Sequence, residues 1–207
     1  GTPRRGGRLP GCAARRGARR AVAPSDLARH AGLEPCIAGS DRACGVATIG
    51  HVPERVSPRL DAAQGTATSA GIDADAVLEA ISGLVEKSLV SLCQQAPPRF
   101  RLAEATRLHA IEHLSASGEA EAVQHQHVVF MNSFMRDAYR AWLATAEAPW
   151  RGLVEPELDS LRAALHRALV TGTDLATGAE LAASALPLWL TGDAHRRAEG
   201  LGYVQRA

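Results

Sequence analysis

Two histidines and a glutamate in the segment LHAIEHL (residues 108–114) have the spacing of an inverted zinc-protease signature. In this H-x-x-E-H pattern the histidines, here His109 and His113, bind zinc, and the glutamate, here Glu112, serves as the general base. At 100° per residue the two histidines fall on one face of a helix, as two zinc ligands must. The pattern alone therefore predicts metal-assisted hydrolysis.

The surroundings of this pattern argue against a metal site. Leu108, Ile111 and Leu114 form an apolar stripe, so we expect them to face the core and both histidines to face water. A catalytic zinc also needs a third protein ligand and a cleft, and the sequence identifies neither. We assign no metal-binding residue, and a zinc hydrolase built on His109 and His113 stays a third hypothesis that metal analysis would test.

No other motif in the chain predicts catalysis or cofactor binding. The sequence holds no G-x-x-x-x-G-K-[ST] phosphate loop, no G-x-S-x-G elbow and no carboxylate pair in a recognisable cleft. The four cysteines lack the C-x-x-C spacing of zinc and redox sites. We therefore expect a protein that is not an enzyme, with no catalytic residue and no cofactor.

The composition indicates a helical, cytoplasmic protein. Apolar residues make up 46% of the chain but aromatic residues only 4%, and the many alanines and leucines favour helices over sheets. A net charge of +1 gives no strong preference for nucleic acid or membrane, and no apolar run is long enough to cross a bilayer. Cysteines without a partner motif are typical of a cytosolic chain.

Residues 60–118 have the pattern of a winged helix-turn-helix domain, for which residues 59–71 would supply the first helix and turn. The expected elements are a helix over 73–87, strands over 88–94 and 99–103 around a turn at 95–98, and a helix over 104–117. Gly118 is well placed to close that last helix. A helix leading into a β-hairpin is the second half of a winged helix.

Residues 119–207 are expected to be helical and to begin a tetratricopeptide-like array. The expected elements are a helix over 119–144, a connection bracketed by Pro149 and Pro156, a helix over 157–169, a break at 171–173, a helix from the cap Asp174 to residue 190, and a helix from about Ala194. The predicted fold class is mainly α: a winged helix-turn-helix with a small β-hairpin, followed by this helical array. Since the chain begins without Met and stops inside a helical pattern, we expect a fragment of a longer protein.

Four blocks of this sequence resemble one family. They are AVLEAISGLVEKSLV (76–90), RFRLAEATRLHAIEHLSASGEAEAV (99–123), EPELDSLRAALHRAL (155–169) and LPLWLTGDAHRRAEGLGYVQRA (186–207). In this order they resemble the winged-helix and tetratricopeptide-like region of bacterial signal-transduction ATPases with numerous domains, a group that includes LuxR-like transcriptional regulators. In the last block, the residues at matching positions are Trp189, Gly192, Glu199, Gly200 and Tyr203. The resemblance covers residues 60–207 and implies a winged helix that packs against a nucleotide-binding core.

Residues 1–59 do not match that family. They are rich in Arg, Gly, Pro and Ala, and the first 20 include seven arginines and no acid. We expect them to be disordered or irregular, and a basic arm for nucleic acid is the alternative. A one-base shift of the reading frame, with GC-rich codons, turns parts of this segment into the tryptophan- and phenylalanine-containing blocks that the family shows here. A frameshifted translation is thus a hypothesis that the nucleotide sequence would test.

The charges predict that the winged helix does not bind DNA. The helix in the recognition position carries Asp73, Asp75, Glu79 and Glu86 against the single Lys87, and a duplex would repel it. The strand that follows the turn adds two arginines, Arg99 and Arg101. We expect these two to be interaction residues, together with a second charged face made by Asp159, Arg162 and His166 at helical spacing.

The sequence therefore predicts a non-enzymatic regulatory or interaction fragment of a signal-transduction ATPase or transcriptional regulator. The expected partner is the nucleotide-binding domain of the parent protein or another protein, with no role for a membrane. The alternative is an autonomous DNA-binding winged-helix protein that grips phosphates with its basic N-terminal arm. Salt-dependent binding to duplex DNA would separate the two hypotheses.

Overall fold

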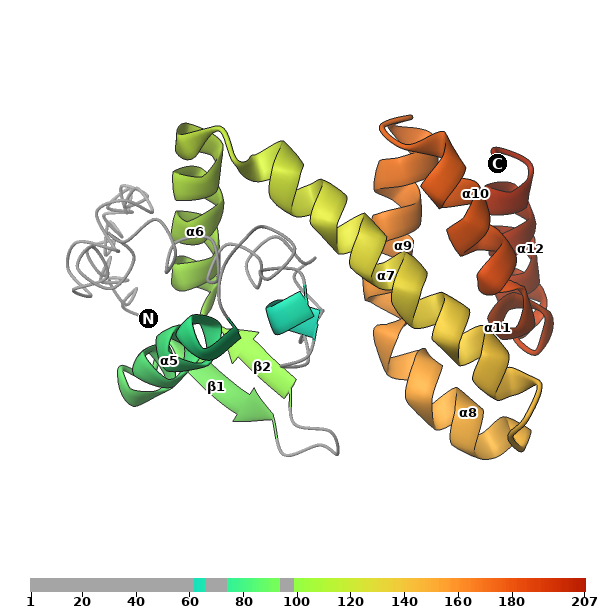
Figure 1. Ribbon diagram of the computed structural model, residues 1–207, viewed down its shortest axis with the longest axis horizontal. Coiled ribbons are helices and arrows are strands. Elements are labelled where there is room, and N and C mark those ends of the chain that lie inside the picture. Colours follow the sequence, from blue (N-terminus) through green and yellow to red (C-terminus); the bar gives the residue numbers. More distant parts are fainter. Residues whose placement is uncertain (1–61, 66–73, 94–98) are drawn as a thin grey trace, which may run out of the picture.

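The computed structural model describes residues 62–65, 74–93 and 99–207. They form a hairpin lobe and a helical lobe, joined by one long helix, α7 (Figure 1). The prediction of a mainly helical fold with one small β-hairpin is confirmed. The expectations for residues 1–59, for the turn at 95–98 and for most of the helix and turn at 59–71 lie outside the described residues, although residues 62–65 form one helical turn.

The hairpin lobe follows the predicted order closely. Its elements are α5 (Ala74–Glu86), β1 (Val90–Cys93), β2 (Arg99–Leu102) and α6 (Glu104–Ser117). The strands are antiparallel, with Val90 opposite Leu102 and Cys93 opposite Arg99. α6 ends at Gly118, whose φ of 76° is the left-handed conformation expected of a C-terminal cap.

The first strand begins two residues later than predicted, because the C-terminal cap of α5 occupies residues 87–89. Ser88 has a φ of 58°, its N–H donates to the carbonyl of Val85, and the Leu89 N–H donates to the carbonyl of Leu84. These two bonds form a Schellman motif with serine in the position that glycine usually takes. Strand β1 therefore begins only at Val90.

The helical lobe contains one helix that the sequence did not predict. Its elements are α7 (Ala120–Trp142), α8 (Glu147–Val154), the 3₁₀ turn η1 (Glu155–Glu157), α9 (Leu158–Leu165), the π-helical turn η2 (His166–Val170), α10 (Leu175–Ser184), α11 (Leu186–Leu190) and α12 (Ala194–Val204). The prediction that Pro149 and Pro156 bracket a simple connection is wrong. Pro149 lies in the first turn of α8, where a backbone N–H has no partner within the helix, so proline does not prevent this helix.

The single helix predicted from Asp174 to residue 190 is two helices. Asp174 caps α10 as expected, with its Oδ1 3.1 Å from the N–H of Thr177. The helix is interrupted at Ala185, because Pro187 has no N–H to donate and its ring crowds the carbonyl one turn earlier. Asp193 caps α12, accepting from the Arg196 N–H at 2.8 Å.

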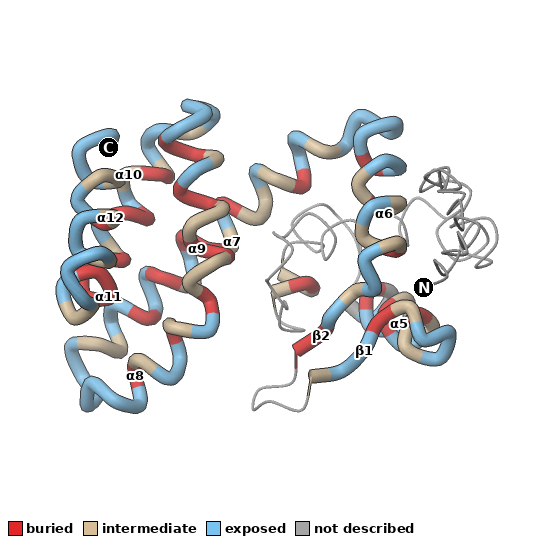
Figure 2. The backbone as a smooth tube through the Cα atoms, turned by 180° about the vertical axis from the view of Figure 1, so that it is seen from behind, coloured by how far each residue is buried: buried red, intermediate tan, exposed pale blue. Residues whose placement is uncertain are grey.

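Two separate hydrophobic cores meet along α7 (Figure 2). The core of the hairpin lobe includes Leu84, Leu114 and, from the first turn of α7, Val123. The core of the helical lobe begins at Val128 on the same helix. The four residues between them, 124–127, are Gln-His-Gln-His, so α7 passes from one core to the other through a polar stretch.

Candidate functional site

The two histidines of the zinc pattern lie on α6, with ring centroids 6.5 Å apart. His113 is exposed, but His109 is partly buried, and neither of its ring nitrogens has a hydrogen-bond partner in the described part of the chain. The prediction that both face water is therefore wrong for His109. No group of three His, Cys, Asp or Glu side chains among the described residues could hold a metal ion.

The apolar stripe of α6 also differs from the prediction. Leu108 is 37% exposed, and the buried residues are Thr106, Ala110 and Leu114, spaced one turn apart. Ala110 and Leu114 belong to the core of the hairpin lobe. The buried face of α6 is therefore not the stripe of its largest side chains. Tertiary packing decides which face is buried, and that face lies closer to His109.

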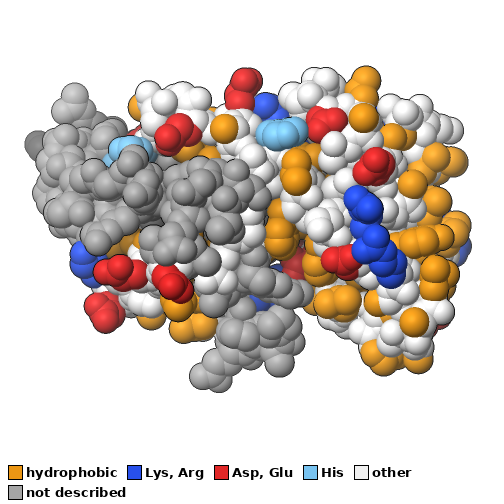
Figure 3. Space-filling model, in the orientation of Figure 1, with side chains coloured by type: hydrophobic (Ala, Val, Ile, Leu, Met, Phe, Trp, Pro, Cys, Tyr) orange, Lys and Arg blue, Asp and Glu red, His pale blue; other side chains and the backbone are white. Residues whose placement is uncertain are grey.

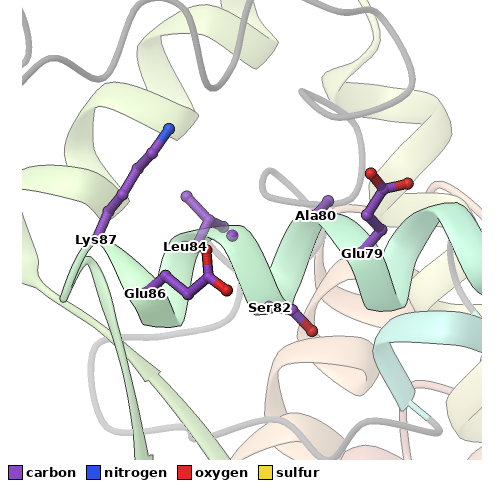
Figure 4. Close-up of a pocket in the computed structure, with 7 residues that line it drawn as sticks. Glu79, Ala80, Ser82, Leu84, Glu86 and Lys87 are labelled. Carbon is purple, nitrogen blue, oxygen red and sulfur yellow. The ribbon is translucent and has the colours of Figure 1, made fainter.

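The exposed surface of α5, the helix in the recognition position, is mainly acidic. Asp75, Glu79 and Glu86 are exposed beside Lys87, and Figure 3 shows acidic side chains gathered over this helix. A hollow of about 310 Å³ lies against it, lined by Glu79, Ala80, Ser82, Gly83, Leu84, Glu86 and Lys87 (Figure 4). These residues provide carboxylates, one ammonium and one hydroxyl, and no activated nucleophile.

The two arginines of the hairpin have different roles. Arg101 is exposed in β2, on the surface where the sequence predicts an interaction. Arg99, two residues earlier, is only 5% exposed, and its Nη2 is paired with the Oε1 of Glu157, at the end of η1. Arg99 therefore contacts the helical lobe of its own chain and is not available on the surface for an external partner.

Arg162 is likewise occupied within the chain. Its guanidinium makes two bonds to Glu199 on α12, at 2.6 and 2.7 Å, and a third, at 3.0 Å, to Asp159. The hydrogen bonds to Glu199 raise the pKa of Arg162 above its ordinary value, burial lowers it, and the bond to Asp159 raises it further. His166, the third residue of the predicted charged face, is exposed in η2.

A second charged network ties α8 and η1 to α12. Glu155 accepts from Arg151 on α8 and from Arg196 on α12, the latter at 3.0 Å. The hydrogen bond from Arg151 holds the pKa of Glu155 below its ordinary value, opposed by burial and assisted by Arg196. Arg151 also donates to the carbonyl of Thr191 at 3.1 Å, which fixes the turn before α12.

Three of the five residues that carry the family resemblance near the end of the chain, Trp189, Gly200 and Tyr203, meet at the contact between α11 and α12. The indole of Trp189 is 2% exposed, and the ring of Tyr203 lies beside it with a centroid separation of 6.0 Å. Gly200 faces the same indole, where a Cβ atom would lie 2.3 Å from its Cγ. Glu199 is the partner of Arg162. Four of the five matching positions therefore join α12 to the rest of the helical lobe.

Sequence reasoning missed Glu157 as an interaction residue. Glu157 is 4% exposed, although it lies within a segment of alternating acids that looks like a solvated helix start. Its partner is 58 residues away in sequence, beyond the reach of any helical or strand spacing. Glu157 is buried because the hairpin lobe covers it, so its role can be recognised only when the relative position of the two lobes is known.

No helix among the described residues is both long enough and apolar enough to cross a membrane. No protein-family model matches the chain, and no solved structure matches it. Curated relatives do match: proteins of Mycobacterium tuberculosis, strains H37Rv and CDC 1551, and of Mycobacterium bovis are each 38% identical to it over 154 residues.

These relatives all carry the provisional name of HTH-type transcriptional regulator. The matched region covers 70% of this chain but 16% of each relative, so the chain spans a small part of their length. The chain is therefore similar to one region of large proteins that are named as transcriptional regulators.

Proposed function

We propose that this chain is a regulatory module of an HTH-type transcriptional regulator and that it acts by binding protein rather than by reading DNA. The similarity to the mycobacterial relatives supports the regulatory setting. The observation that carries the choice of protein over DNA is the distribution of charge on the hairpin lobe.

A winged helix that reads DNA presents basic residues on its recognition helix and its wing. Here α5 exposes Asp75, Glu79 and Glu86 beside a single lysine. The wing has two arginines. Arg99 is buried against Glu157, so of these two Arg101 alone is exposed to a phosphate. This charge pattern repels phosphates. It suits a protein partner whose contact surface is basic or packs against the hairpin lobe.

In finer detail, we propose that the parent protein is a signal-transduction ATPase and that the partner of the hairpin lobe is its nucleotide-binding domain. The resemblance of residues 60–207 to that group supports this proposal. The helical lobe would then be the start of a tetratricopeptide-like sensing array, working in the cytoplasm. Since the 207 residues hold no phosphate-loop motif, no ATP hydrolysis is proposed for them.

Direct DNA binding is the second candidate, because the relatives carry the HTH name. The seven arginines in the first 20 residues also support it, since a basic arm can hold phosphates without sequence preference. In this case affinity would come from the arm, and the hairpin lobe would contribute through Arg101.

Fluorescence anisotropy with a labelled DNA duplex, measured over a range of salt concentrations, tests both candidates. We expect the full chain to show no salt-sensitive binding of micromolar strength near physiological ionic strength. Two variants assign any binding that appears: Arg101→Gln in the wing, and a quadruple Arg→Gln change at Arg15, Arg16, Arg19 and Arg20 in the arm. Binding that disappears with Arg101→Gln would overturn the proposal, whereas binding that disappears only with the arm variant would assign it to the arm and leave the hairpin lobe a protein-binding module.

A further inference from the structure

The contact between the two lobes contains a charged pair that neither hydrophobic core includes. Arg99 is the first residue of β2, and this end of the strand faces the helical lobe in both views of the backbone (Figures 1 and 2). Glu157 is the last residue of η1. Their side chains are each 6% exposed, so the pair lies in a water-poor seam between the lobes.

A buried ion pair of this kind fixes an orientation more than it adds stability. Removing two charges from water costs free energy that offsets most of their mutual attraction. When the seam opens, both side chains recover their hydration, whereas the separation of two apolar surfaces would expose them to water at a net cost. The closed and open arrangements can therefore lie close in free energy, which is the requirement for a two-state element.

Among the described residues, two further features of the boundary between the lobes are compatible with such a change. The cores are separate, and α7 passes between them through the polar residues 124–127. Gly65 makes a second contact across the seam, since a Cβ atom there would lie 2.7 Å from the ring of Phe130 on α7. Opening the seam would break the contact between Gly65 and Phe130, but it would not divide either core, because the buried core residues form one cluster in each lobe.

We propose that the Arg99–Glu157 ion pair is a latch that holds the hairpin lobe against the helical lobe, and that its release lets the hairpin lobe change its orientation. The pair joins a strand of the hairpin to the turn between α8 and α9. A partner that displaces either side chain would change how the lobes are arranged. The latch does not depend on the identity of that partner, so it can fail or hold independently of the proposed function.

The chain carries its own donors for an energy-transfer experiment. All three tryptophans, Trp142, Trp150 and Trp189, lie in the helices of the helical lobe. Cys93 is unsuitable for the acceptor because it lies directly opposite Arg99 in the hairpin. Replacing all four cysteines with serine and the exposed Ser82 of α5 with cysteine gives a single site for a fluorescent acceptor in the hairpin lobe. Transfer from tryptophan to that acceptor then reports the distance between the lobes in the full chain.

Glu157→Gln removes the charge with little change in shape, and we expect it to lower the transfer efficiency. The exchanged pair Arg99→Glu with Glu157→Arg should restore efficiency toward that of the parent, because it rebuilds the attraction with opposite polarity. Unchanged transfer in Glu157→Gln would overturn the latch. So would a fall that the exchanged pair fails to restore, since this would point to side-chain shape rather than pairing.

A matched control separates the latch from general loss of an ion pair. Arg140→Gln breaks the pair with Asp137 on the surface of α7, where the two side chains are 67% and 68% exposed. It should leave transfer unchanged, and a fall as large as in Glu157→Gln would contradict the proposal. If Glu157→Gln does not fold, Glu157→Asp keeps the charge on a shorter side chain. In that variant a weakened latch predicts reduced transfer with the helical circular dichroism preserved, and full transfer would again overturn the proposal.

Discussion

The packing of α12 on α11 depends on the absence of a side chain at Gly200, and adding a single methyl group tests it. A Cβ atom at Gly200 would lie 2.3 Å from Cγ, 2.5 Å from Cβ and 2.8 Å from Cδ1 of Trp189. The closest of these is more than 1 Å shorter than an ordinary van der Waals contact of 3.4–4 Å. Since the indole is 2% exposed and packed in the core, it has little room to move, and α12 must shift instead.

The expected cost of Gly200→Ala follows from two opposing effects. Overpacking of a filled core costs typically about 1–3 kcal/mol, and the depth of this overlap favours the upper end. Alanine regains roughly 1 kcal/mol over glycine in a helix. The net loss is about 2 kcal/mol, which corresponds to a fall in Tm of about 4–8 °C for a chain of this size.

Gly152→Ala is the matched control, because Gly152 lies in α8 with nothing within 4 Å of its added Cβ. It should gain the higher helix propensity of alanine without an overlap like that at Trp189, and so raise Tm by about 2–4 °C. Differential scanning calorimetry or thermal circular dichroism measures both variants. A Gly200→Ala protein as stable as Gly152→Ala would refute the close approach of α12 to Trp189.

Two further predictions concern the helical lobe. Trp150→Phe removes an indole N–H that donates to the buried carbonyl of Ala138 at 2.7 Å. This change should lower the free energy of unfolding, measured in urea, by about 1–3 kcal/mol. The neighbouring Trp142→Phe, in which no described hydrogen bond is lost, should lower it less. Because Arg151 lowers the pKa of Glu155 below its ordinary 4.5, the stability from this group is present above that pH and is lost as pH falls through the lower folded value. Between about pH 5 and about pH 3, Glu155→Gln should therefore lose less stability than the parent chain, and equal losses would contradict this contribution.

The elements of the fold were predictable where local chemistry decides them. Gly118, Asp174 and the alternation around Arg99 mark the ends of helices and a strand, and the structure places those ends within one or two residues of the prediction. The errors in the predicted helices have local causes, and the sequence pattern alone does not show which of two effects a proline will have. Pro149 begins a helix and Pro187 interrupts one, because the same residue is tolerated in a first turn and disruptive after it.

The candidate site was less predictable than the fold, because long-range packing decides which charges remain on the surface. Arg99 and Arg101 look equivalent in the sequence, yet one is buried and the other exposed. Asp159 and Arg162 were predicted to be a contact face from their spacing, and Arg162 instead has its strongest contact with Glu199, 37 residues away. Helical spacing identifies neighbours on one element, but it cannot identify a partner on another.

The burial of Arg99 also connects the two candidate functions. While Arg99 is paired with Glu157, the hairpin offers Arg101 beside an acidic α5, and phosphate binding is disfavoured. Release of the pair would expose the Arg99 guanidinium. The wing would then present a second positive charge beside Arg101. The latch would then set how much positive charge the hairpin lobe can present to DNA.

Glu157→Gln tests this connection in the DNA titration. The titration is run at low salt, where the basic arm gives the parent chain a measurable affinity. If Arg99, once separated from Glu157, contacts one phosphate, the slope of log K against log salt should become steeper by about 0.9 relative to the parent chain. Combining the change with Arg99→Gln should return the slope to the parental value, because the added contact is then removed. A slope that Glu157→Gln leaves unchanged would mean that opening the seam does not bring Arg99 to DNA, and the hairpin lobe would then bind protein in both arrangements.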